Sequence, residues 1–105
     1  MLAVADPGAA LARRLRSLLA FRGVTIEEVR SRAWASVTFT GARHEFCLRL
    51  EGEGAEAAAD RLLAQLGNAD FPMRGHIVAD IACASQERSP GCIRLRIEAL
   101  TVEDL

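Results

Sequence analysis

Apolar residues recur at helical spacing in two separate stretches of the chain. The first stripe consists of Leu11, Leu15, Leu18 and Leu19, and the second of Ala58, Ala59, Leu62, Leu63 and Leu66. Positions three or four apart share one face of an α-helix, so each stripe predicts a helix with one buried side. We therefore expect helices over residues 8–22 and 55–66. Gly23 and Gly67 would end them, because glycine readily takes the left-handed conformation that follows a helix.

Four further stretches alternate apolar and polar residues with a period of two, which is typical of half-buried β-strands. In the first of them, the apolar positions are Ala33, Ala35, Val37 and Phe39. The alternation predicts strands over residues 33–40, 44–51, 77–84 and 93–102. We expect the turns of the two hairpins at Gly41-Ala42 and at residues 87–91. The short apolar stretch 2–5 predicts one more strand in front of the first helix.

The expected order is a short strand, a helix, two strands, a second helix and two strands. Strands with one apolar face need helices on that face alone, and this predicts a two-layer α+β sandwich with an antiparallel sheet. The 105 residues suffice for a single domain. A second copy commonly covers free edges and an open face, so we expect a homodimer. The open face would carry Trp34, Thr38, Arg49, Asp80, Arg94 and Arg96.

Most of the chain resembles an ACT domain, a small regulatory module of amino-acid metabolism. The resemblance rests on Asp6-Pro7-Gly8, on the helix that follows, and on the run from Arg22 to Glu27. It covers residues 2–85 and implies a ferredoxin-like βαββαβ core over residues 1–86. The segment 87–105 would add an extra turn and strand, paired beside the strand 76–85. The resemblance also implies a homodimer that binds a small effector such as an amino acid, without a cofactor.

Carried onto this chain, the effector site would lie at Asp6, Pro7 and Gly8. A helix N-terminus offers unpaired N–H groups and partial positive charge, which suit a carboxylate. Gly8 would let a ligand approach the backbone, and Asp6 would hold an ammonium group. Thr25 stands where the family usually has a ligand-binding Asn. The alternative is that Asp6 simply caps the helix while Gly8 makes the turn.

Other functions remain open at this point. One is a small enzyme or binding protein that uses the open face, and another is an interaction subunit that docks on a larger enzyme. Thr25-Ile26-Glu27-Glu28 is also a capping-box pattern, so residues 29–35 would be a recognition helix in a helix-turn-helix DNA binder. The formal net charge of −1 disfavours that function, and we expect no nucleic-acid partner.

The sequence offers little for metal binding or catalysis. His44 and Cys47, like His76 and Cys83, are separated by odd offsets, so their side chains would point to opposite faces of a strand. We therefore expect no metal site and no catalytic residues, and we expect His44 to be a hydrogen-bonded core histidine. Asp80 would form a cross-strand ion pair with Arg94 or Arg96, and would otherwise carry a raised pKa in its apolar row.

Composition adds a few expectations about the surroundings of the protein. Every basic residue is an arginine, and there is no tyrosine. Three cysteines cannot form a complete disulfide framework, so we expect Cys47, Cys83 and Cys92 to be buried free thiols. No secretory signal and no apolar stretch of about 20 residues is visible, which favours a cytoplasmic protein without a membrane partner.

Overall fold

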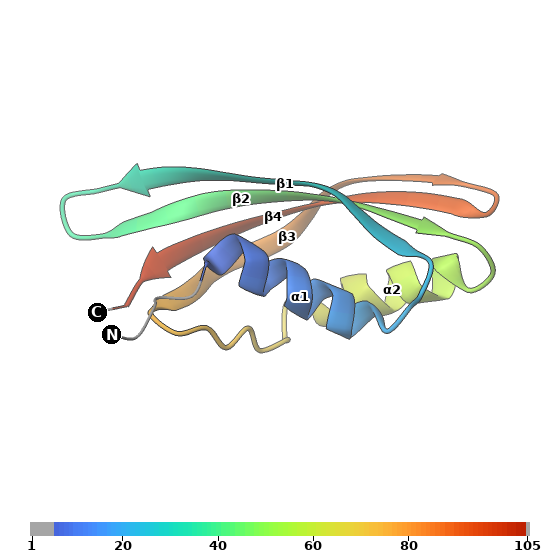
Figure 1. Cartoon of the computed structure of the whole chain (residues 1–105), viewed down its shortest axis with the longest axis horizontal. Coiled ribbons are helices and arrows are strands. Elements are labelled where there is room, and N and C mark those ends of the chain that lie inside the picture. The colour runs from blue at the N-terminus through green and yellow to red at the C-terminus, as the bar shows by residue number, and fades with distance from the viewer. Residues whose placement is uncertain (1–5, 105) are drawn as a thin grey trace.

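The computed structural model describes residues 6–104, which form two helices and four strands (Figure 1). The elements in chain order are α1 (Pro7–Leu19), β1 (Val24–Ala35), β2 (Thr40–Glu51), α2 (Ala55–Gln65), β3 (His76–Ser89) and β4 (Cys92–Glu103). The four strands build one antiparallel sheet, and both helices lie on the same side of it. The expectation of an α+β architecture with an antiparallel sheet is therefore confirmed.

The order of strands in the sheet differs from the expected one. It is β1-β2-β4-β3, so the C-terminal strand pairs with β3 on one side and with β2 on the other. A ferredoxin-like βαββαβ sheet needs its first strand at the centre, and β4 holds that central place here. The expected pairing of the last strand beside β3 is confirmed, but this strand also pairs with β2 and therefore lies inside the sheet. The strand expected at residues 2–5 lies outside the described residues.

The first hairpin turns earlier than the alternation suggested. The turn covers residues 36–39, where the Ser36 N–H donates to the Phe39 carbonyl at 2.7 Å. Gly41 is not the turn but a strand residue opposite Trp34. Residues 25–35, which the helix-turn-helix hypothesis needs as a helix start and recognition helix, are strand, so that hypothesis is wrong. The second turn is also shorter than expected, because β3 continues to Ser89.

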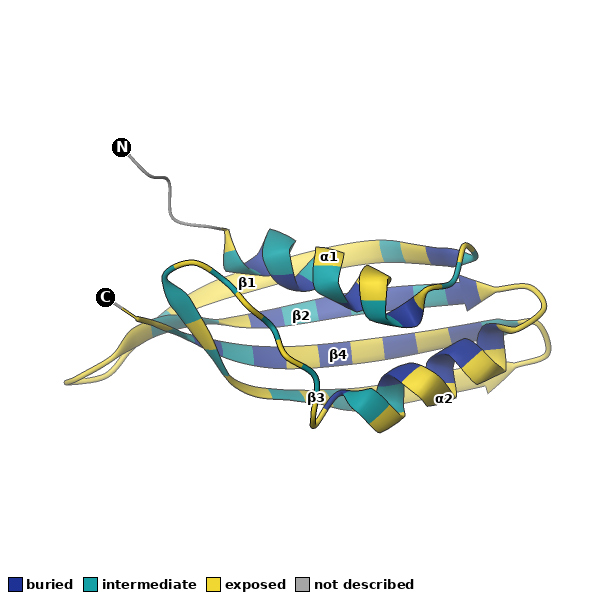
Figure 2. Cartoon of the chain, turned by 90° about the horizontal axis from the view of Figure 1, so that it is seen from below, coloured by how far each residue is buried: buried dark blue, intermediate teal, exposed yellow. Residues whose placement is uncertain are grey.

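The hydrophobic core lies between the helices and the two inner strands (Figure 2). The helical stripes supply Leu11, Leu15, Leu19, Ala58, Ala59 and Leu62, and the strands supply Phe46, Leu48, Leu50, Ile93, Leu95 and Ile97. The far half of β1 and the adjoining turn extend beyond α1, so Ala33, Ala35, Val37 and Phe39 are exposed, with neither helix above them. Their expected burial is wrong, because the alternation does not reveal where a covering helix begins.

Helix α1 ends three residues before the end that Gly23 suggested. Ala20 takes the left-handed conformation, with φ of 47°, and ends the helix. The Leu19 carbonyl accepts a hydrogen bond of 2.6 Å from the Arg61 guanidinium of α2, which joins the two helices at this end. Gly23 instead starts the strand pairing, since its carbonyl accepts from the Glu51 N–H at 2.9 Å. None of the described helices is both long and apolar enough to cross a membrane.

Gly41 permits the close pairing of β2 with β4, and this can be tested. A Cβ atom there would overlap the Thr101 carbonyl oxygen and would lie 3.1 Å from the Trp34 Nε1 atom. We expect Gly41→Ala to lower the free energy of unfolding by about 1–3 kcal/mol, the usual cost of overpacking. Gly67→Ala, where a Cβ atom meets open space, is the matched control. Urea unfolding of both variants measures the difference, and equal stabilities would contradict the assignment.

Candidate functional site

The face of the sheet that points away from the helices is the candidate site. Its residues on the two inner strands include Arg43, Glu45, Cys47, Arg49, Arg94, Arg96, Glu98, Leu100 and Val102, with Gly41, Glu51 and Cys92 at the two ends. We call this surface the open face. The register makes Arg49 the direct partner of Arg94 and places Arg96 opposite Cys47. Sequence reasoning therefore placed these three arginines correctly on one surface.

Carboxylates neutralise the arginines at this end of the open face. Glu27 lies 3.8 Å from Arg49 and 3.5 Å from Arg94. It is the extra residue of a β-bulge between Ile26 and Glu28. The sequence pattern gave no sign of this bulge. Exposed ion pairs of this kind contribute only about 0–1 kcal/mol each, so they define a surface pattern more than they stabilise the fold.

Arg96 takes part in a second group of ion pairs. Its guanidinium donates to Glu45 at 2.8 Å and lies 3.6 Å from Glu98. The hydrogen bond from Arg96, followed by its charge, lowers the pKa of the Glu45 carboxyl, and the same contact raises the pKa of Arg96. Both groups therefore remain charged at neutral pH, and the Glu45 carboxylate offsets the charge of Arg96.

Asp80 does not form the expected cross-strand ion pair. Its partner in the register is Leu100, whereas Arg94 lies opposite Glu87 and Arg96 opposite Ser85. Two irregularities in β3, after Val78 and after Cys83, shift the register. Simple alternation along β3 could not reveal these shifts.

The other end of the open face is apolar. Trp34, Gly41, Val102 and Ile77 are neighbours in the register across all four strands, and we call them the apolar row. Ile77 is 53% exposed. Leu100, two residues before Val102 in β4, lies on the same face. Trp34 is half-buried beside Gly41, where the missing side chain leaves room for the indole. A partly exposed apolar row next to a charged surface is typical of a binding surface.

The N-terminus of α1 is capped by its own chain. The Asp6 carboxylate accepts hydrogen bonds from the Gly8 N–H at 3.0 Å and the Ala9 N–H at 3.3 Å, and Pro7 begins the helix. Thr25 lies past the other end of α1, as the partner of Arg49 on the open face. The structure does not bring Thr25 to the Asp6–Gly8 turn, because the helix and the sheet separate them.

A polar cluster under the start of α1 connects His44 with two hydroxyl groups. The Nδ1 atom lies 2.7 Å from the Ser31 hydroxyl, and Nε2 lies 2.9 Å from the Thr101 hydroxyl. Thr101 donates in turn to the Ala42 carbonyl at 3.4 Å. Thr101 thus accepts from Nε2–H, which leaves Nδ1 to accept from Ser31. The expectation of a hydrogen-bonded core histidine is confirmed, since His44 is only 1% exposed.

The environment of His44 favours its neutral form. Burial lowers the pKa of the imidazole, the nearby Asp6 charge opposes this, and His76 adds to it. A neutral imidazole beside an exposed serine hydroxyl has the geometry of a base and a nucleophile. In catalytic pairs of this kind a carboxylate often orients the base, but here the Thr101 hydroxyl holds that position. The N–H groups at the start of α1, which could stabilise an oxyanion, already donate to the Asp6 carboxylate. Sequence reasoning did not link the three side chains, because they come from three strands.

The cysteines are less buried than expected. All three are free and of intermediate exposure. The Cys83 thiol donates to the Ser85 carbonyl at 3.2 Å, and burial raises the pKa of this thiol. Cys47 and Cys92 lie on the open face opposite Arg96 and Glu51. Within residues 6–104, no three His, Cys, Asp or Glu side chains gather as a metal site would require.

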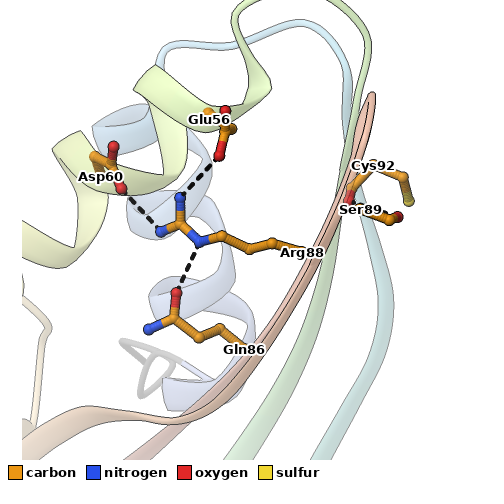
Figure 3. Close-up of polar contacts among 6 residues, drawn as sticks. All are labelled: Glu56, Asp60, Gln86, Arg88, Ser89 and Cys92. Carbon is orange, nitrogen blue, oxygen red and sulfur yellow. Dashed lines mark hydrogen bonds and ion pairs between the residues drawn. The ribbon is translucent and has the colours of Figure 1, made fainter.

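Arg88 holds α2 against the end of β3 (Figure 3). Its guanidinium donates to Asp60 at 2.8 Å and to the Gln86 side chain at 2.9 Å, and it lies 3.6 Å from Glu56. A hollow of about 720 Å³ lies beside these groups at the start of α2. Two carboxylates balance the single arginine, so this contact orients the helix and leaves no excess positive charge for an anion.

No protein-family model, no curated protein and no solved structure matches this chain.

The buried imidazole should make stability depend on pH. The unfolded chain takes up a proton near the ordinary histidine pKa of 6.5, while the folded protein resists protonation to lower pH. Stability should therefore fall as the pH drops below about 6.5, by at most about 1.4 kcal/mol per pH unit for one group. Chemical unfolding between pH 5 and 8 should show a weaker dependence for His44→Gln. An unchanged slope, or a His44 NMR titration at or above 6.5, would contradict this.

Proposed function

We propose that the chain is a homodimeric binding module of the small regulatory type, with the open face as its working surface. The observation that carries the proposal is the one-sided sheet, in which both helices lie against one face. On the other face the apolar row adjoins an array of charged side chains. A domain of this size cannot cover both faces with two helices, so the second face is available to a partner.

One version of this function follows the ACT-like resemblance of the sequence. In that version a small effector, such as an amino acid, is held between two copies and shifts the pairing equilibrium. An effector does this only if its affinity differs between the two states. The Asp6 contacts at the start of α1 occupy two of the amides that such an effector would use. We therefore place effector and partner on the open face, where charged side chains of both signs lie beside the apolar row that contains Trp34.

The apolar row would form the centre of the contact between copies. Apolar residues surrounded by charged ones are the usual composition of a specific interface. Opposite charges interspersed around the row would align the two copies and oppose other pairings. Ile77 is the best probe of this contact, because it is more than half exposed and its replacement leaves the core intact.

Sedimentation velocity over a range of protein concentrations tests the proposal. We expect a monomer–dimer equilibrium in the wild type, and Ile77→Arg should raise the dissociation constant at least tenfold, which is about 1.4 kcal/mol. Val29→Arg is the matched control, since Val29 is 44% exposed and its register partner Phe46 places it on the helix side of the sheet, away from the row. Urea unfolding should show that both variants fold.

Two results would contradict the proposal. One is a wild-type chain that stays monomeric at millimolar concentration, and the other is an equal effect of both arginine variants. Calorimetric titration with the twenty amino acids tests the effector separately, and twenty flat traces at millimolar ligand would remove the amino-acid version.

A further inference from the structure

Two arginines face each other directly across the outer half of the β1–β2 hairpin. Arg32 and Arg43 are partners in the register, and both side chains are exposed. The ion pairs found within residues 6–104 include neither guanidinium. Like charges directly opposite on neighbouring strands destabilise a sheet. The arrangement therefore has an electrostatic cost that a bound anion would relieve.

A hollow coincides with this pair. Its volume is about 520 Å³, within the range of small-molecule sites, and it is lined by Arg30, Ser31, Arg32, Arg43 and Glu45. Three guanidinium groups thus meet a single carboxylate, and Arg96 already binds that carboxylate at 2.8 Å. Arg30 has its own partner in Glu28 at 2.7 Å. The positive charge left without a partner belongs to Arg32 and Arg43.

We propose that Arg32 and Arg43 bind the phosphate group of a small soluble metabolite. A phosphate group carries about −1.5 to −2 charge at neutral pH, which matches two guanidinium groups, and its oxygens accept paired N–H donors from arginine. Trp34 follows Arg32 on the same face of β1, so the carbon part of the ligand would lie toward the apolar row. The inference deepens the proposed function by naming a ligand class for the binding module, and it stands on the arginine pair.

Trp34 supplies the measurement, because it is the only tryptophan of a chain without tyrosine. Inorganic phosphate is titrated at constant ionic strength, with chloride as the balancing salt and the protein concentration fixed. We expect a saturable change of tryptophan fluorescence and a rise in melting temperature. Arg43→Gln should weaken phosphate binding at least tenfold. Arg13→Gln, which removes the same charge from the exposed side of α1, should bind like the wild type.

A charge reversal provides a second, independent readout. Arg43→Glu replaces the opposed arginines by an opposite-charge pair with Arg32. In chloride alone, this variant should melt at a higher temperature than the wild type, and phosphate should raise its melting temperature no further. A merely structural role of Arg43 predicts the reverse order of stability.

Three results would overturn the inference. The first is an equal effect of phosphate and chloride on the wild type, and the second is equal phosphate binding by the Arg43→Gln and Arg13→Gln variants. The third is a response of the wild type to vesicles of anionic phospholipid, titrated in parallel, without a response to inorganic phosphate. The proposed function fails separately, because a strictly monomeric wild type that still binds phosphate through Arg43 removes the dimer and leaves this site intact.

Discussion

The rest of the structure depends on the pairing of β4 with both β2 and β3. The register with β2 runs without interruption from Gly41–Val102 to Glu51–Cys92. An isolated hairpin is marginally stable in water, and a sheet needs at least three strands with an apolar face. By joining the two hairpins, β4 places Ile93, Leu95 and Ile97 beneath both helices and makes one core out of two units.

This joining also creates the surface on which the proposed functions rest. Every second residue is buried from His44 to Leu50 in β2 and from Ile93 to Thr101 in β4, so the residues between them point to the other side of the sheet. There, glutamates offset the arginines at one end, the apolar row occupies the other, and the Arg32–Arg43 pair lies next to that row. A ligand phosphate and a second copy would therefore approach neighbouring parts of one face.

The helix face contains a different arrangement at the same end of the sheet. His44 is buried with both ring nitrogens bonded to hydroxyl groups, and Gly8 lies so close that a Cβ atom there would come within 3.0 Å of the Ser31 hydroxyl. Buried polar side chains whose hydrogen bonds are all made favour a single packing of the chain, whereas a buried polar group without a hydrogen bond lowers the stability of the fold. The cluster thus fixes where the start of α1 lies on the sheet.

The sequence by itself determined both helices, the alternation of β2 and β4, the cap at Asp6 and the burial of His44. These features depend on the spacing of residues that are close in the chain, and the periods of 3.6 residues for a helix and 2 residues for a strand predict them directly. Only the tertiary structure decided that β4 lies at the centre, that Asp80 faces Leu100, and that Arg32 lies opposite Arg43. Strand order and register depend on contacts between distant segments, and a bulge of one residue, as at Glu27, changes which side chains meet.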